Sequence, residues 1–91
     1  MPGYRQTASF KKDYKKLNEE LQQAAKKAFR LFQENPGHPS LYIHRLDGHK
    51  GIWGGHITEK FVFTFSKEKT DDGDLIFWFR RIGDHTVYKK P

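Results

Sequence analysis

The chain of 91 residues contains no cysteine, and this absence removes several classes of protein. Without thiols there is no disulfide framework, no thiolate metal site and no cysteine nucleophile. Small secreted domains usually carry disulfides. No apolar run approaches the ~20 residues of a membrane span, and residues 1–12 lack the apolar core of a secretory signal. We therefore expect a cytoplasmic protein without membrane attachment.

Apolar residues are scarce at 35 %, yet aromatic residues make up 15 % of the chain. A chain of this length typically forms one domain, so residues 1–91 are expected to share one core built from few, large side chains. Acidic residues are also outnumbered, with 11 Asp and Glu against 17 Lys and Arg, a net charge of +6. A basic domain attracts phosphate backbones without sequence preference. The alternative is an ordinary solvated surface.

The first third of the chain has helical periodicity. Apolar side chains recur every three or four residues from Phe10 to Phe32, and lysine and glutamate occupy the other face. Ser9 is the predicted first cap and Asn18 the second, so two helices over 9–17 and 19–34 are expected to pack as a hairpin. One long helix is the alternative. Residues 35–37 (NPG) end the helical region.

The remainder alternates like β-strands. Residues 61–66 (FVFTFS) predict a half-buried strand, and 75–79 (LIFWF) a central strand covered on both faces. The turn at 71–74 makes these two an antiparallel hairpin. Residues 51–57 (GIWGGHI) predict the preceding strand, and residues 3–7 an edge strand. Gly54 and Gly55 weaken the strand at 51–57, or else mark a bulge or a close approach by a ligand. The fold class is α+β, with a helical pair on one face of a small antiparallel sheet.

The open face of such a sheet is where chemistry is expected, and histidine is the candidate residue type. Of five histidines, His56 ends one strand and His85 follows the central one, so neighbouring strands can bring them together. The spacing of His44, His49 and His56 matches no metal-ligand pattern, and neither a metal nor another cofactor is expected. Histidines scattered over the surface are the alternative. Glycine-rich phosphate loops, Gly-x-Ser-x-Gly and His-Glu-x-x-His are absent from the sequence.

An acid/base pair in a basic, aromatic-lined groove suits metal-free cleavage of RNA. One group takes the proton of the ribose 2′-hydroxyl, the other protonates the leaving 5′-oxygen, and cations stabilise the phosphate charge. Tyr88 is a candidate to stack on a base, or else a packing residue of a C-terminal strand. Strand alternation predicts that one of two adjacent arginines faces the groove and the other the helix side or rim. The candidate cations are Arg45, Lys50, Arg80 and Arg81.

Several segments in a fixed order resemble a known family. They are Phe-Lys-Lys at 10–12, Asn-Pro-x-His-Pro-Ser-Leu at 35–41, His-Arg-Leu-x-Gly at 44–48, Trp-Gly-Gly-His at 53–56, Phe-Val-Phe-Thr-Phe at 61–65 and Arg-Arg-Ile-Gly-Asp-His-x-x-Tyr at 80–88. Over about residues 4–90 the chain resembles the RelE/ParE superfamily of bacterial toxins from type II toxin–antitoxin modules.

The resemblance implies a microbial-RNase-like domain with two N-terminal helices against a curved antiparallel sheet. RelE-type members cleave mRNA in the ribosomal A site and leave a 2′,3′-cyclic phosphate, so the partners implied are the ribosome and mRNA. ParE-type members instead poison DNA gyrase. Both are neutralised by an antitoxin that wraps the toxin, which implies a hetero-oligomeric complex.

The resemblance also assigns roles to residues. His85 matches the catalytic position after the last core strand, and Tyr88 the aromatic residue that contacts the substrate base. His56 matches, within a residue, a His or Lys of the sheet face in the family. His44 corresponds to a histidine of the histidine-rich ribonucleases of the family, and Lys50 lies in a loop where basic residues often occur. The expected function is an mRNA endoribonuclease in which His85 and His56 are the acid/base pair and His44 is a third catalytic candidate.

One position departs from the family pattern. Relatives often carry arginine in the strand at the place of Val62, so the cation that stabilises the phosphate is either missing or supplied by Arg80 or Arg81. Two alternatives follow: a non-catalytic or ParE-like toxin that binds gyrase, and an RNA-binding module without catalysis.

Overall fold

The structure is a computed structural model that describes residues 3–91. In chain order its elements are β1 (Gly3–Gln6), α1 (Ala8–Lys16), α2 (Glu19–Glu34), the 3₁₀ helix η1 (Pro39–Leu41), β2 (His44–Arg45), β3 (Ile52–His56), β4 (Phe61–Lys69), β5 (Leu75–Asp84) and the 3₁₀ helix η2 (His85–Lys89). Within the described residues no helix is long and apolar enough to cross a membrane.

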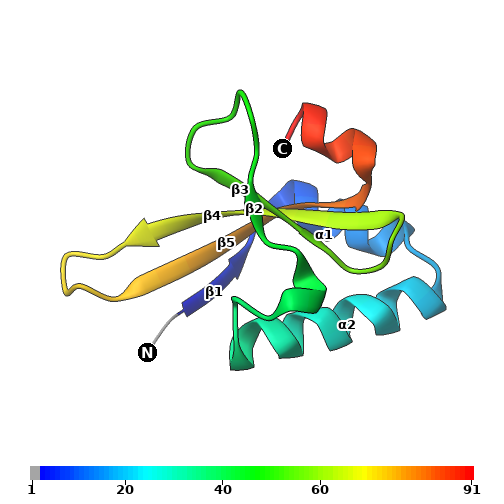
Figure 1. Ribbon diagram of the computed structural model, residues 1–91, viewed down its shortest axis with the longest axis horizontal. Coiled ribbons are helices and arrows are strands. Elements are labelled where there is room, and N and C mark those ends of the chain that lie inside the picture. Colours follow the sequence, from blue (N-terminus) through cyan, green and yellow to red (C-terminus); the bar gives the residue numbers. More distant parts are fainter. Residues whose placement is uncertain (1–2) are drawn as a thin grey trace.

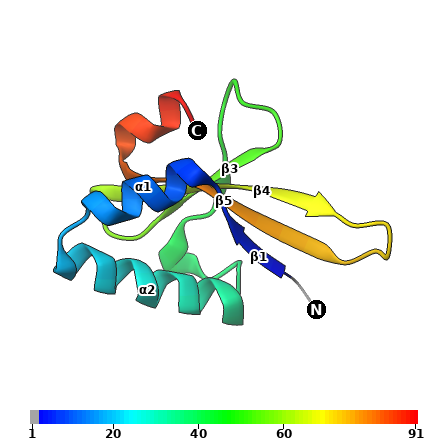
Figure 2. The ribbon, with the colours of Figure 1, turned by 180° about the vertical axis from the view of Figure 1, so that it is seen from behind.

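The two predicted helices are confirmed, and each begins at a side-chain cap. The Asn18 side chain accepts a hydrogen bond from the Leu21 backbone N–H, as expected. The first cap was wrong by two residues: Thr7, not Ser9, precedes α1 and accepts from the Phe10 N–H. Thr7 also donates its hydroxyl to the Arg80 carbonyl, which ties the start of α1 to β5. Figure 2 shows α1 and α2 running antiparallel as a hairpin.

The five strands form one sheet in the order β1-β5-β4-β3-β2. The α+β class is confirmed (Figure 1), and the edge strand expected near residues 3–7 is present. The expectation of a wholly antiparallel sheet was wrong, because β1 pairs with β5 in parallel, with Gly3 opposite Ile76 and Gln6 opposite Phe79. A parallel pair requires a long crossover, and here the intervening chain includes both helices and three strands.

The core lies between α2 and one face of the sheet. The Phe32 ring of α2 packs edge-on against four strand phenylalanines at centroid distances of 4.9–6.2 Å, namely Phe63, Phe65, Phe77 and Phe79. The α1 helix adds Phe10 at the β5 side of this cluster. Burying each such ring stabilises the fold by roughly 1.5–3 kcal/mol, so a few large side chains suffice for a chain poor in apolar residues.

The opposite, outer face of the sheet is only partly covered. The η2 helix lies on this face, on the far side of the sheet from α2 (Figure 1). Val62 and Thr64, which alternate with the core phenylalanines, are fully buried. Toward the β4–β5 turn, Ile76 and Trp78 are only half-buried. The prediction that residues 75–79 are covered on both faces was therefore wrong.

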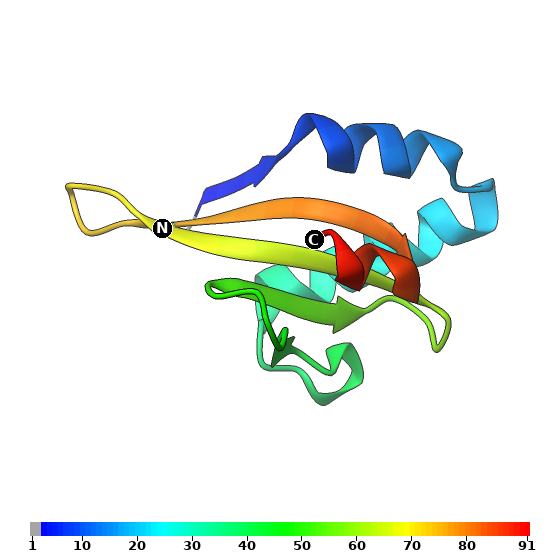
Figure 3. The ribbon, with the colours of Figure 1, turned by 90° about the horizontal axis from the view of Figure 1, so that it is seen from above.

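A bulge in the β4–β5 pair changes which way the two arginines of β5 point. Phe65 pairs with Phe79 but Thr64 pairs with Arg81, so Arg80 is an extra residue in β5. Ile82 consequently joins Phe79 in the core, and the strict alternation from which the division of Arg80 and Arg81 between two faces was predicted is interrupted at the bulge. Figure 3 shows the β4–β5 hairpin projecting from the sheet, since β3 ends its pairing at Ser66.

Candidate functional site

Three histidine rings and one tyrosine meet on the outer face, beside η2. The ring centroids of His56 and His85 lie 5.5 Å apart, and those of His44 and His56 lie 6.4 Å apart. The Tyr88 ring contacts both His44, at 5.6 Å, and His85, at 5.5 Å. We call these four residues the histidine cluster. It joins β2, β3 and η2, which are far apart in the sequence.

Gly54 and Gly55 of β3 allow Tyr88 to lie against the strand. His44 pairs with Gly54, so His44 lies on the same face as the Gly54 position. A Cβ at Gly54 would lie 2.8 Å from the Tyr88 ring, so only glycine lets that ring approach the strand. The Tyr88 hydroxyl then donates to the Gly55 carbonyl at 3.4 Å. The close approach expected here for a ligand is made in the structure by a side chain of the same chain, and β3 pairs with β4 without a bulge.

Backbone carbonyls orient two of the imidazoles. His85 Nε2 lies 3.3 Å from the Glu59 carbonyl, and His44 Nδ1 lies 2.8 Å from the Tyr42 carbonyl. A carbonyl oxygen only accepts, so these ring nitrogens carry hydrogen. The second nitrogen of each ring, Nδ1 of His85 and Nε2 of His44, is thus the one that can exchange a proton. Asp84 caps η2 by accepting from the Thr86 N–H at 2.9 Å, which fixes the start of the helix that carries His85.

Burial sets the protonation of the two partly covered groups. Desolvation lowers the pKa of His56 below its ordinary value of 6.5, and repulsion from His85 and His44 lowers it further. His56 is therefore mostly neutral at pH 7. Burial raises the pKa of Tyr88 to about 12, so its hydroxyl stays protonated. The cluster thus holds one imidazole suited to accepting a proton. Within residues 3–91 no group of three or more His, Asp or Glu side chains is placed to hold a metal ion.

The predicted cations do not gather around the histidines. The Arg45 guanidinium lies 5.0 Å from the centre of the Trp53 ring and the Lys67 amine 4.2 Å from it, as in cation–π contacts. Arg45 follows His44 directly and so points to the opposite face of β2. Arg45, Lys50 and Trp53 share a separate cavity of about 310 Å³.

The two arginines of β5 are engaged elsewhere. Arg81 donates to both carboxylate oxygens of Asp13, at 2.6 and 3.2 Å, and to the Lys90 carbonyl. Asp13 also accepts from the Ile82 N–H, and so closes the β5 edge that β1 leaves open. Hydrogen bonding to Asp13 raises the pKa of Arg81, which remains charged. Arg80 donates from Nε to the Pro91 carbonyl.

The Val62 position offers no alternative site for a cation. Val62 pairs with Gly83 and is fully buried. A Cβ at Gly83 would lie 3.1 Å from Val87 of η2, so the helix sits directly over this part of the sheet. An arginine here would have to displace η2 or run beneath it. The neighbouring Thr64 hydroxyl is buried without a hydrogen-bond partner.

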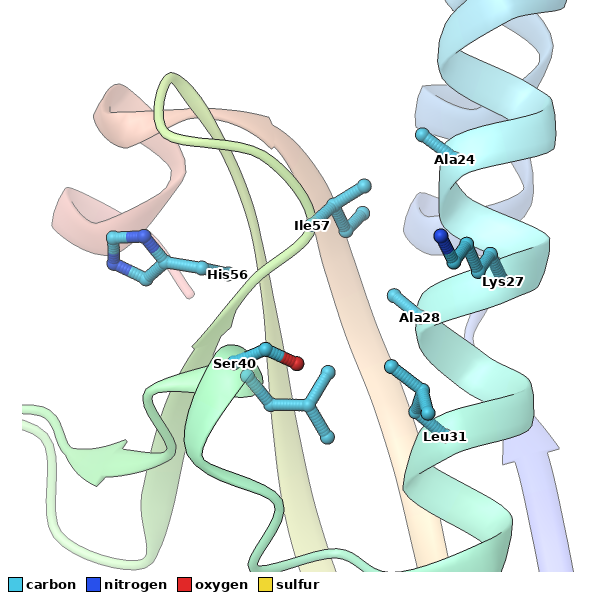
Figure 4. A pocket seen from close by; sticks show the side chains of 8 residues that line it. Ala24, Lys27, Ala28, Leu31, Ser40, His56 and Ile57 are labelled. Atoms are coloured by element: carbon cyan, nitrogen blue, oxygen red, sulfur yellow. The ribbon is translucent and has the colours of Figure 1, made fainter.

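Two cavities border the β3 end, and His56 lies at both. The first, of about 310 Å³, separates α2 from β3 and has mainly apolar walls. Figure 4 shows that Ile57 points toward α2 across this cavity while the His56 ring turns toward η2. The second, of about 420 Å³, shares Ser40, His56 and Ile57 with the first and is also lined by Tyr42, Thr58 and Glu59. Tyr42 and Glu59 were not predicted as site residues. Tyr42 precedes His44 by two positions, and an aromatic residue so close to a candidate histidine was the one available signal.

Comparisons with known proteins place the fold. No protein-family model and no curated protein sequence matches the chain. Solved structures do match, all at low identity. The chain is similar to a YoeB/ParE toxin from Agrobacterium tumefaciens, with a TM-score of 0.73 and 16 % identity over 91 % of this chain and 98 % of that one. It is also similar to YafQ from Escherichia coli, with a TM-score of 0.73 and 21 % identity over 96 % and 97 %.

A third similar structure is the RelB–RelE antitoxin–toxin complex of Methanococcus jannaschii, with a TM-score of 0.66 and 15 % identity over 94 % of this chain and 95 % of that one. These matches extend over nearly the whole of both chains, so they concern the complete arrangement of helices and sheet. The chain has the same fold as these toxins of the RelE/ParE type, and the fold implied by the sequence resemblance is confirmed.

Proposed function

We propose that the protein is the toxin of a type II toxin–antitoxin module and that it cleaves mRNA on the ribosome by acid/base catalysis. The observation that carries this proposal is the convergence of His44, His56 and His85 around Tyr88 on the outer face. Histidine is the side chain best suited to moving protons near neutral pH. The similarity of the fold to YafQ, RelE and YoeB/ParE toxins supports the same proposal.

The reaction requires one base and one acid. His56, whose pKa is lowered, takes the proton of the ribose 2′-hydroxyl. The 2′-oxygen then bonds to phosphorus as the bond from phosphorus to the 5′-oxygen breaks. His85 gives a proton from Nδ1 to that leaving oxygen, while its Nε2 stays bonded to the Glu59 carbonyl. The products are a 2′,3′-cyclic phosphate and a free 5′-hydroxyl. The ring centroids of His56 and His85 lie 5.5 Å apart. At this separation the two rings can form ordinary hydrogen bonds to the attacking 2′-oxygen and the leaving 5′-oxygen on either side of one phosphorus.

Charge on the phosphate must be stabilised without a strand arginine. The imidazoles of His85 and His44, on either side of Tyr88, are the side chains of the cluster that we assign to this role. We assign Arg80 to the phosphate region, because within residues 3–91 its side chain makes a hydrogen bond only from Nε, to the Pro91 carbonyl, which leaves its terminal nitrogens for phosphate. Arg45 and Lys50 are assigned to flanking phosphates, and Tyr88 to the base at the cleavage site. Arg81, held by Asp13, is assigned a structural role instead of the predicted substrate contact.

An antitoxin is the expected partner. Two of the similar structures are complexes of a toxin with its antitoxin, RelB–RelE and DinJ–YafQ. An acidic or amphipathic segment is favoured at the cluster, because its carboxylates would compete with the RNA phosphates for the imidazoles and for Arg80, which we assign to the phosphate region. We propose that the antitoxin covers the histidine cluster in a hetero-oligomeric complex.

The deciding experiment is cleavage of mRNA on programmed ribosomes by the purified protein. Wild type is expected to leave a 2′,3′-cyclic end, and His85→Ala to lose at least about 100-fold in rate, the usual contribution of one proton transfer. His49→Ala is the matched control, because His49 lies outside the cluster. Equal cleavage by His85→Ala would contradict the assignment of the acid.

The buried Val62 favours a second candidate, a ParE-like toxin that binds DNA gyrase without cleaving RNA. The same preparations are therefore tested for trapping of cleaved DNA by gyrase. Trapped DNA together with intact mRNA would select this alternative. Salt-sensitive RNA binding with neither activity would select a plain RNA-binding module.

A further inference from the structure

Tyr42 stands apart from the other aromatic residues because its ring is exposed. The relative accessibility of Tyr42 is 67 %, and within residues 3–91 no other large hydrophobic side chain is exposed. The remaining described aromatics lie in the core or are half-buried. An isolated apolar residue at a surface needs no explanation by itself, so the argument depends on what surrounds this one.

The backbone at Tyr42 adopts a conformation that tyrosine rarely takes. Its φ of +48° lies in the left-handed region, and within residues 3–91 no other residue except glycine has a positive φ. Glycine would adopt this conformation without strain. The same turn directs the Tyr42 carbonyl to His44 Nδ1 at 2.8 Å and holds the Tyr42 ring beside the histidine cluster. Strain of this kind concentrates at functional sites.

The Tyr42 ring forms one wall of a cavity that adjoins the proposed catalytic base. Its centroid is 5.3 Å from that of His56, with the planes inclined at 55°. The cavity, of about 420 Å³, is within the range of ligand sites. Ile57 gives it an apolar wall, and Thr58 and Glu59 give it hydrogen-bonding groups. No ion pair of the Glu59 carboxylate is found among the residues that the structure describes.

We propose that this cavity binds one nucleobase of single-stranded RNA, stacked on Tyr42, next to the phosphate handled by His56 and His85. The inference rests on the proposed function and adds a second base site to the one assigned to Tyr88. Aromatic rings are the usual platforms for unpaired bases, and every base offers a flat face to them. Polar groups at the rim then meet the edge of the base. Tyr42 is a positioning residue for substrate.

The test uses fully 2′-O-methylated RNA, which lacks the attacking hydroxyl and so reports binding alone. Affinities are measured for an intact oligonucleotide and for a series with one abasic nucleotide at each position in turn. The variants are Tyr42→Gly, which removes the ring and suits the left-handed backbone, and Tyr42→Phe, which keeps the ring. Thermal unfolding of each variant verifies the fold.

Tyr42→Gly is expected to bind intact RNA about 5- to 150-fold more weakly, the range of one lost stacking contact, and Tyr42→Phe within about twofold of wild type. Wild type and Tyr42→Gly are expected to bind equally when the abasic nucleotide occupies the stacked position, because the two deletions remove the same contact. A uniform loss across the whole abasic series, or no loss at all, overturns the inference. The former result would indicate that Tyr42 contacts something other than a base.

The outcome is separable from that of the proposed function. If the abasic series behaves as expected while unmodified mRNA stays intact on programmed ribosomes, the base site stands and the ribonuclease proposal fails. If mRNA is cleaved and Tyr42→Gly binds and cleaves like wild type, the reverse holds. Binding of an antitoxin segment but of no RNA by wild type would overturn both and assign Tyr42 to the protein interface.

Discussion

At the scale of single residues, His56 connects the fold and the proposed chemistry. It is flanked by His85 on one side and His44 on the other. Partial burial lowers the pKa of His56, and repulsion from the two neighbouring imidazoles lowers it further. Three imidazoles within 6.4 Å of a neighbour cannot all be charged without mutual repulsion. The arrangement therefore favours a state in which His56 is neutral.

This coupling predicts a pH dependence of stability. The folded state binds a proton at His56 less readily than the unfolded state does, so protonation favours unfolding. The contribution of His56 is complete above about pH 6.5 and is lost as the pH falls from there through its lowered folded pKa. His56→Gln is expected to lose less stability than wild type between pH 8 and pH 5, measured as the free energy of unfolding in urea. An equal loss in both proteins would show that His56 is not the destabilised group.

At the scale of elements, successive residues of β3 face opposite sides of the sheet, one side toward the histidine cluster and the other toward the core. Gly54 faces Tyr88, whereas a Cβ at Gly55 would lie 2.6 Å from the Phe63 ring and 2.7 Å from Ile43. One strand thus admits a functional side chain on one face and a core ring on the other, through two adjacent glycines.

The two glycines predict different consequences for the same substitution. Gly54→Ala is expected to displace the half-buried Tyr88 ring and so reduce mRNA cleavage; it also crowds Leu46, 2.9 Å from the added Cβ, but lowers stability less than Gly55→Ala because it meets no core phenylalanine. Gly55→Ala overpacks the core and is expected to destabilise the fold by roughly 1–3 kcal/mol. Chemical denaturation and the ribosome assay, run on both variants, separate the effects. Loss of stability in Gly54→Ala as large as in Gly55→Ala would refute the division.

Element types were predictable because each has its own periodicity. The 3.6-residue pattern and the Asn18 cap located α2, and the alternation of residues 61–66 located β4. Thr7 was missed as a cap because Ser9 offers the same chemistry nearby. The parallel pairing of β1 was missed because a short strand carries no signal of its partner's direction. The bulge at Arg80 was missed because the extra residue leaves no mark in the sequence.

The sequence indicated which histidines lie close together, but it did not indicate which partners hold the arginines. Strand order suggested that His56 and His85 are neighbours, and their rings do lie together. Their catalytic roles, and that of His44, stay predictions. The cations were harder, since Arg45 and Arg81 have partners, Trp53 and Asp13, that only the folded chain brings near. Tyr42 was missed because its exposure follows from a left-handed turn.

At the scale of the whole molecule, the net charge of +6 is spread over more than one surface. Lysines of the helical pair, such as Lys15, are exposed. They are distant in sequence from the strand residues that form the histidine cluster. Arg45 and Lys50 lie near Trp53. Counterions are released from RNA only where a cation contacts a phosphate. The salt dependence of RNA affinity can therefore distinguish the helix lysines from Arg45 and Lys50.

We expect RNA affinity to fall with salt and the slope to depend on which lysine is removed. Lys50→Gln should lower the slope of log K against log salt by about 0.7, the value for one phosphate contact on a single strand. Lys15→Gln, an equal change of charge on α1, should leave the slope unchanged. Titrations of the same 2′-O-methylated RNA at several salt concentrations provide the measurement. Equal slopes for both variants would mean that charge acts only through the overall field.

The pairing of β1 with β5 also sets an order of events during synthesis. Thr7 bonds to the backbone of Phe79 and Arg80, residues made more than 70 positions later. A growing chain can form its helical hairpin early, since those contacts are local, but β1 waits without a partner until β5 has left the ribosome. The third histidine of the cluster and the tyrosine follow β5 directly. A nascent chain therefore carries an incomplete histidine cluster until the residues of η2 have been made.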